Sequence, residues 1–211
     1  MLIDELKNIA RNNGIVGAGG AGFPAYAKMT EKADTVILNC VECEPLLKLH
    51  RQLLATHTEE IIQMLDEVRE SFGAKEAVIG IKSEYVTTIK AIEEVIGDFP
   101  NVRICALKAA YPMGDEVVLI YEATGRVIKP GGLPIDENVV VYNVETMYNL
   151  YRAVHLNIPV TNKLVSIVGE IDHPLTVRVP LGTTVKEAIS LAGKITVEDP
   201  AYVMGGPMMG R

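Results

Sequence analysis

The strongest constraint on the fold is a regular alternation of short apolar runs with amphipathic segments in the first half of the chain. Residues 35–40 and 77–81 lack polar alternation, which is the pattern of strands covered on both faces, and residues 102–107 form a third short run. Between them, residues 56–73 and 89–96 repeat apolar side chains at helical intervals. This βαβαβ order predicts an α/β fold with a parallel, Rossmann-like sheet, right-handed crossovers and helices on both faces.

Start and stop signals indicate the ends of three helices. A short helix is expected within the first 13 residues, because Gly14 follows its last apolar turn. Thr56 and Glu59 have the spacing of a capping box at the start of a second helix. Asp115 is expected to cap a helix over residues 116–124, since acidic side chains favour the amino end of a helix.

The pattern changes after residue 160. Residues 164–168 and 176–179 read as two strands around a turn, residues 185–191 as a short helix, and residues 201–204 as a returning strand. These elements predict a small β-grasp-like module. We therefore expect two domains, 1–160 and 161–211, joined through a connector that contains Pro159.

Composition excludes several classes of function. The chain has 211 residues, a formal net charge of −7 and 48% hydrophobic residues, so it can bury a core but lacks the basic surface that nucleic acid requires. No apolar stretch reaches the roughly 20 residues of a membrane-spanning helix, and no signal peptide is recognisable, so we expect a cytoplasmic protein without direct membrane insertion. No Ser-His-Asp or Cys-His arrangement favours a hydrolase.

The three cysteines leave two interpretations open. Cys40 and Cys43 form a Cys-x-x-Cys that is compatible with half a metal site or a redox pair. A second pair is lacking, and the four histidines fall at no recurring metal spacing, so buried free thiols without a metal are the favoured interpretation.

The clearest local signal for a ligand is the segment 16–24, whose four glycines permit positive φ angles and a close approach of main-chain amides to an anion. Phosphate is a typical ligand of such a loop. The loop precedes the first strand, so it is not the dinucleotide fingerprint that follows a strand and opens a helix. A flexible turn is the alternative.

Polar side chains gather where ligands of open parallel sheets are expected, beyond the carboxyl ends of the strands. They come from the segments 39–45 and 111–116 and from Asn143, which follows the apolar run 139–141. Lys28 lies six residues past the last loop glycine and can neutralise a phosphate. Solvated loops, helix capping and a strand end explain the same residues without a ligand.

Six motifs in order carry a family resemblance that covers essentially the whole chain: GAGGAGFPxxxK, NxxECEP, YPxGDE, GGLP, NVET and GGPMMG. The chain resembles the 51 kDa flavoprotein subunit of respiratory complex I and, more closely, the C-subunit of Rnf complexes and the cobalamin reductases of propanediol utilisation. The segment from Leu164 resembles the soluble-ligand-binding β-grasp (SLBB) domain of that family.

The resemblance implies a function and a set of binding residues. It implies an oxidoreductase that binds FMN, takes hydride from NADH and, in the full-length protein, passes electrons through 4Fe-4S clusters to an acceptor such as a corrinoid, a ferredoxin or a redox partner protein. The residues that match FMN contacts are Gly17, Gly19, Gly20, Lys28, Asn39, Glu42, Tyr111, Gly114, Asp115, Asn143 and Thr146. Those that match the NADH side are Phe23, Glu44 and Glu116, and no residue is assigned as catalytic.

The chain also departs from complex I. Ala18 stands where complex I has an arginine, Val41 where it has an aspartate, Tyr142 where it has an asparagine, and Glu31 where it has a second stacking phenylalanine. An alternative function is therefore a non-catalytic docking scaffold that has lost flavin. The resemblance further suggests an N-terminal fragment without the iron-sulfur segment, from a protein that is peripheral to a membrane complex or enclosed in a bacterial microcompartment.

Overall fold

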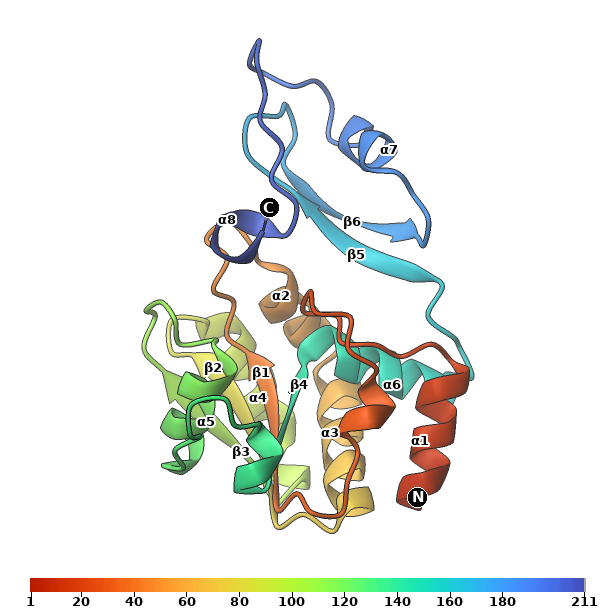
Figure 1. Cartoon of the computed structure of the whole chain (residues 1–211), viewed down its shortest axis with the longest axis vertical. Helices are drawn as coiled ribbons and strands as arrows, with labels where there is room; N and C mark the ends of the chain where they lie inside the picture. Colours follow the sequence, from red (N-terminus) through yellow and green to blue (C-terminus); the bar gives the residue numbers. More distant parts are fainter. Residues whose placement is uncertain (211) are drawn as a thin grey trace. The chain divides into compact units, whose positions relative to one another are not determined.

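A four-stranded parallel sheet organises the first part of the molecule (Figure 1). Its strands lie in the order β3-β2-β1-β4, with the bounds β1 Thr35–Cys40, β2 Glu76–Lys82, β3 Val102–Leu107 and β4 Val139–Asn143. Thr35 at the start of β1 pairs with Glu76 on one side and Val139 on the other. The structure, a computed structural model, describes residues 1–210, and it confirms the parallel α/β fold.

Helices cover both faces of this sheet. The helices in chain order are α1 (Ile3–Asn12), α2 (Leu49–Thr56), α3 (Thr58–Phe72), α4 (Val86–Val95), α5 (Glu116–Thr124), α6 (Val144–Leu156), α7 (Val185–Ser190) and α8 (Gly206–Met209). Short 3-10 turns η1, η2 and η3 occupy Ala25–Lys28, Ile96–Asp98 and Pro134–Glu137. α3 and α6 pack side by side and contact β1 (Figure 1).

The opposite face is covered by α5. Leu119 and Ile120 of this helix share a buried cluster with Ile37 of β1 and Val141 of β4. The approach is close, because a Cβ added at Gly80 of β2 would lie 2.5 Å from Cδ1 of Leu119. Alternate residues of β1 thus serve the two faces, which explains why the strand is apolar without interruption.

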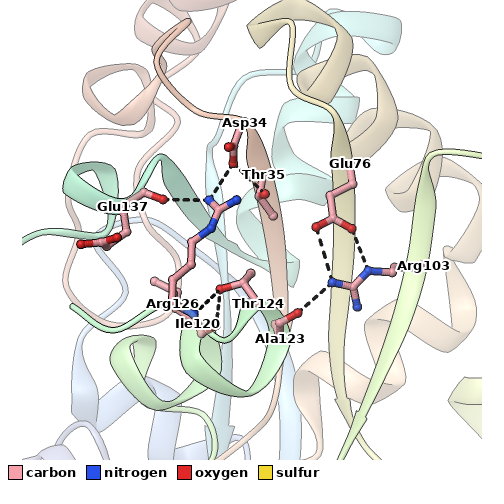
Figure 2. Close-up of polar contacts among 9 residues, drawn as sticks. All are labelled: Asp34, Thr35, Glu76, Arg103, Ile120, Ala123, Thr124, Arg126 and Glu137. Atoms are coloured by element: carbon pink, nitrogen blue, oxygen red, sulfur yellow. Dashed lines mark hydrogen bonds and ion pairs between the residues drawn. The ribbon is translucent and has the colours of Figure 1, made fainter.

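Two charged contacts fasten the amino-end side of the sheet (Figure 2). Nη1 of Arg126, just after α5, donates to Oδ1 of Asp34 at 2.6 Å and to the carbonyl of Glu137 at 2.8 Å. On the neighbouring strands, Nε of Arg103 donates to Oε2 of Glu76 at 2.7 Å. The Arg126 contacts link the chain after α5 to the segments that precede β1 and β4, and the Arg103 contact joins β3 to β2.

One predicted helix start is wrong. Thr56 does not form a capping box with Glu59, because it is the last residue of α2 and its hydroxyl donates back to the carbonyl of Gln52. α3 begins two residues later, at Thr58, and the side chain of its cap residue His57 pairs with Oε1 of Glu60 at 3.2 Å instead of capping a main-chain amide. The other two predicted ends are confirmed, since α1 lies within the first 13 residues and Asp115 caps α5.

Residues cluster into two compact units. Unit 1 comprises residues 1–43 and 50–159, and unit 2 comprises residues 44–49 together with the chain from Val160. Unit 2 contains the antiparallel pair β5 (Asn162–Ile167) and β6 (Leu175–Pro180), which confirms the predicted hairpin, and α7 follows. The predicted strand at residues 201–204 is wrong, because this segment forms no strand.

Candidate functional site

Predicted ligand residues from four segments meet where β1 and β4 end, a region we call the carboxyl edge. β1 and β4 are neighbours, and their last paired residues are Asn39 and Asn143. The chain leaves β1 through residues 41–43 and leaves β4 directly into α6. Side chains from these exits can therefore act together, although they lie about a hundred residues apart in the sequence.

Asn39 and Gly114 bind two loops together. The amide Nδ2 of Asn39 donates to the Gly114 carbonyl at 3.0 Å, while its Oδ1 accepts from the Val41 amide at 3.0 Å. The Gly114 amide donates to Sγ of Cys43 at 3.1 Å. A Cβ added at Gly114 would collide with the Val41 carbonyl oxygen and with this sulfur, so only glycine fits.

The glycine loop is a closed turn anchored to α6. The Gly17 amide donates to the Phe23 carbonyl at 2.7 Å, and the Gly22 amide donates back to the Gly17 carbonyl at 3.2 Å. The Ala18 amide donates to Oγ1 of Thr146 at 2.9 Å, which ties the loop to the first turn of α6. The loop and Thr146, both predicted to contact FMN, are thus brought together.

The tip of this loop offers main-chain donors. Within residues 1–210, no hydrogen bond is donated by the amides of Gly19, Gly20 or Ala21. Gly20 has φ of 120°, which side-chain-bearing residues rarely adopt, and no atom lies within 4 Å of the place a Cβ would take. Successive unpaired amides in a glycine turn form the kind of concavity that binds anions.

Asn143 connects the glycine loop to α2. Its Oδ1 accepts from the Glu145 amide and so caps α6, and its Nδ2 lies 3.1 Å from Nε2 of His50. The same Nδ2 lies 3.3 Å from the place of a Cβ at Gly19. Asn143 therefore finishes a strand, caps a helix and stands directly against the loop.

Lys28 and Glu116 form an ion pair across the carboxyl edge. Nζ of Lys28, at the end of η1, lies 3.3 Å from Oε1 of Glu116, and it also lies 3.4 Å from the Val141 carbonyl. Asp115 is occupied as the cap of α5, where it accepts from the amides of Val117 and Val118. The side chain of Lys28 stays about one third exposed, so an anion can reach it.

Glu42 is the most unusual group at this edge. Its side chain is 1% exposed, and its Oε1 accepts from the His50 amide at 2.9 Å. Oε2 is buried and has no hydrogen-bond partner, while Nε of Arg51 lies 3.9 Å away. Burial raises the pKa of Glu42, although hydrogen bonding from the main-chain amides of His50 and Arg51 and the charges of Arg51 and Lys82 oppose the shift. Such a carboxylate is under-compensated, since a buried charge ordinarily has complete hydrogen bonding.

Sequence reasoning missed the surroundings of Glu42. The guanidinium of Arg51 lies 4.5 Å from the centroid of the Tyr85 ring, at the start of α4. Burial raises the pKa of Tyr85 to about 12, and burial also raises the pKa of the Cys40 thiol, so both groups are uncharged at neutral pH. No local motif connects residues 42, 51 and 85, because their contact arises only when α2 and α4 pack beside β1.

Tyr111 and Phe23, two further predicted residues, are exposed to 63% and 49%. Glu44 belongs to unit 2, where its Oε2 accepts from the Met208 amide at 3.3 Å. The three cysteines are free thiols, and among the described residues no group of three or more His, Cys, Asp or Glu side chains could hold a metal ion.

Comparison with known families decides the relationship. The family described as the Nuo51 FMN-binding domain matches residues 10–152, which include every element of the carboxyl edge. The chain belongs to the Nuo51 FMN-binding domain family. A second family, the SLBB domain, matches residues 164–211, so the Nuo51-type domain is followed by an SLBB domain.

Relatives extend over nearly the whole chain. Cobalamin reductase PduS of Salmonella typhimurium is 41% identical over 207 residues, which cover 98% of this chain and 46% of that protein. The C-subunit of the Na(+)-translocating ferredoxin:NAD(+) oxidoreductase complex of Acetobacterium woodii is 32% identical over 212 residues, which cover 98% of this chain and 48% of that protein. The chain thus spans about half the length of these relatives.

Solved structures support the same fold. An NAD+-reducing NiFe hydrogenase in its H2-reduced state matches with a TM-score of 0.77 and 22% identity, over 92% of this chain and 39% of the hydrogenase chain. Its air-oxidised state matches with a TM-score of 0.76 and 23% identity, over 90% of this chain and 39% of the hydrogenase chain. Among residues 1–210, no helix is both long and apolar enough to cross a membrane.

Proposed function

We propose that this chain binds FMN at the carboxyl edge and accepts hydride from NADH, as the flavin module of an electron-transfer oxidoreductase. The observation that carries the proposal is the set of unpaired amides at Gly19, Gly20 and Ala21 within the described residues, with Lys28 as the nearby cation. Main-chain donors and an ammonium group suit a phosphate monoester. The buried, unpartnered oxygen of Glu42 is a second group that fits a polar ligand.

The remaining FMN contacts would come from the two loops and α6. Gly17 shapes the glycine turn, Thr146 anchors it, and Asn143 stands between that turn and His50. The hydrogen bond from Asn39 to Gly114 joins the loop after β1 to the loop after β3, and Tyr111 and Asp115 belong to the second of these loops. On this proposal, residues 1–160 form the flavin and NADH domain and residues 161–211 the SLBB domain.

The NADH side is proposed for Phe23, Glu44 and Glu116. Phe23 has an exposed ring suited to stacking on a nicotinamide, and the carboxylates can accept hydrogen bonds from ribose hydroxyl groups. Bound FMN supplies the acceptance of a hydride and the release of single electrons. In the full-length protein, we propose that 4Fe-4S clusters carry these electrons to a corrinoid, a ferredoxin or a redox partner protein.

Two variants at one position test the phosphate assignment. Gly20→Asp and Gly20→Asn impose the same strain at φ of 120°, but only the aspartate adds a negative charge beside the proposed phosphate. We expect FMN affinity, measured by quenching of flavin fluorescence, to fall at least about tenfold further in Gly20→Asp than in Gly20→Asn. Equal FMN affinities in the two variants would exclude this loop as the phosphate site.

A docking scaffold without flavin is the second candidate. It is favoured by the pairing of the Ala18 amide with Thr146, which occupies one loop donor, and by Val41, which is apolar at the exit of β1. A folded wild-type chain that is colourless after incubation with excess FMN and removal of the unbound flavin, and that still captures a redox partner, would support this candidate over the first.

A further inference from the structure

Glu42 carries a charge that its surroundings only partly compensate. The Oε1 atom is satisfied by the His50 amide at the start of α2, but Oε2 is buried without a hydrogen-bond donor. Nε of Arg51 is 3.9 Å from Oε2, within reach of electrostatic attraction and beyond hydrogen-bond distance. A carboxylate in this state accepts a proton more readily than an exposed one.

The groups around Glu42 come from four elements. β1 contributes the Cys40 thiol and α4 begins after Tyr85, and neither carries a charge at neutral pH because burial raises the pKa of each. Lys82 at the end of β2 and Arg51 on α2 are cations that favour the ionised carboxylate. His50 supplies the main-chain donor and a titratable ring. Glu42 therefore stands between burial, which favours its protonated form, and two cations, which oppose it.

Arg51 is held in a fixed place. Its guanidinium stacks on the Tyr85 ring, and its carbonyl accepts from Oγ1 of Thr88 at 2.9 Å. A stacked arginine keeps its charge and loses part of its side-chain freedom, so its distance from Glu42 is maintained by packing. This geometry makes Arg51 a positioning residue for Glu42.

We propose that Glu42 takes up one proton from water when flavin bound at the carboxyl edge is reduced, and that Arg51 sets the pH range of this uptake. This inference rests on the proposed flavin binding. NADH delivers a hydride, so the nicotinamide is oxidised, the flavin is reduced by two electrons and one proton, and one negative charge is added. The proton on Oε2 of Glu42 balances that charge, because a new negative charge near a carboxylate favours its neutral form.

The position of Glu42 supports this coupling. It lies three residues after Asn39 and precedes Cys43, whose sulfur accepts from the Gly114 amide. His50, whose amide binds the carboxylate, places its ring 3.1 Å from the Asn143 amide group. His50 thus connects Glu42 to the side chain of Asn143, which lies against the glycine loop.

The test is the midpoint potential of FMN bound to the chain, followed against pH by spectroelectrochemistry. Each proton taken up with two electrons contributes a slope of about 30 mV per pH unit, since a tenfold change in equilibrium constant corresponds to that potential. Wild type should show a range of pH in which the midpoint potential falls more steeply, by about 30 mV per pH unit, because Glu42 takes up one proton there. Glu42→Gln should lack this extra slope.

Arginine variants test the positioning role. Arg51→Met should move this steep range to higher pH, because the ionised form of Glu42 loses its nearest cation, and Arg51→Lys should restore part of the shift. Arg152→Met is the matched control, since Arg152 also lies over a tyrosine, Tyr148, but at the far end of α6. The control should leave the range unchanged.

A flavin-free measurement separates the two proposals. Carbon NMR of the glutamate carboxyl groups in the chain without FMN should show one signal that disappears in Glu42→Gln and titrates at higher pH in Arg51→Met. If FMN fails to bind to wild type, the proposed function fails and the uptake with it, whereas the Arg51 effect on Glu42 is still decided by NMR. Slopes that are equal in wild type and Glu42→Gln, with FMN bound to both, overturn only the proton uptake.

Discussion

Replacing Gly114 by alanine should damage both the stability of the chain and its flavin site. The added methyl group would meet the Val41 carbonyl oxygen and Sγ of Cys43, so one of the two loops must move. Overpacking of this kind costs about 1–3 kcal/mol, and the smaller entropy of the unfolded alanine chain returns about 0.4–1 kcal/mol. Because the added Cβ would overlap a main-chain oxygen, the cost lies at the upper end of its range, and we expect a net loss of about 2 kcal/mol in the free energy of unfolding, measured by urea denaturation.

Gly97→Ala is the matched control for this change. Gly97 has an ordinary φ, and no atom lies within 4 Å of its added Cβ, so only the entropy term applies. A second variant sharpens the test: Cys43→Ala combined with Gly114→Ala should not recover stability, because the carbonyl of Val41 belongs to the main chain. Equal urea midpoints for Gly114→Ala and Gly97→Ala would refute the reasoning about this close approach.

Two further predictions concern charged side chains. Arg126→Met should lower the free energy of unfolding by about 1 kcal/mol at neutral pH, because the pair with Asp34 is partly exposed, and Arg103→Met should cost less. Burial opposes the ionisation of Asp34, but the hydrogen bonds from Arg126 and Thr35 outweigh it and lower the pKa of this carboxyl. The stability lost in Arg126→Met should therefore be constant above the pKa of an unfolded aspartate and vanish as acid protonates Asp34. A loss that is the same at every pH of denaturation would contradict this. Lys28→Met should weaken FMN binding roughly tenfold with little change in stability, whereas the exposed Lys32→Met should not; equal affinities by flavin fluorescence would exclude Lys28 from the phosphate site.

The sequence predicted strands most accurately where both faces of the strand are buried, because an uninterrupted apolar run indicates such a strand directly. The strand at residues 35–40 and the helix at residues 116–124 match β1 and α5, because an uninterrupted apolar run and an acidic cap are local signals. α2 and α6 were not predicted. The first turn of α2 is capped by Glu42, which lies eight residues before His50, outside the spacing of a local capping motif.

The predicted strand at residues 201–204 failed for a similar reason. An apolar run shows that side chains can pack, but a strand also needs a partner edge, which a single run does not reveal. Among the described residues of unit 2, β6 pairs with β5 alone.

The rule for parallel sheets predicted that polar residues after different strands gather at one edge, and the residues after β1 and β4 do so because these strands are neighbours. The rule does not reveal that Asn39 joins two loops or that Glu42 is buried against Arg51. Those contacts depend on packing between segments distant in sequence, which motif spacing does not encode.

The measurement that tests the central claim most directly is equilibrium dialysis of the wild-type chain against FMN, with the bound flavin counted from its visible absorbance. We expect one FMN per chain with a dissociation constant at or below about 1 μM, a typical affinity for a specific small-ligand site. A chain that is folded by circular dichroism and retains no FMN at roughly tenfold higher concentration, about 10 μM, would contradict the proposal that its glycine loop holds a flavin phosphate.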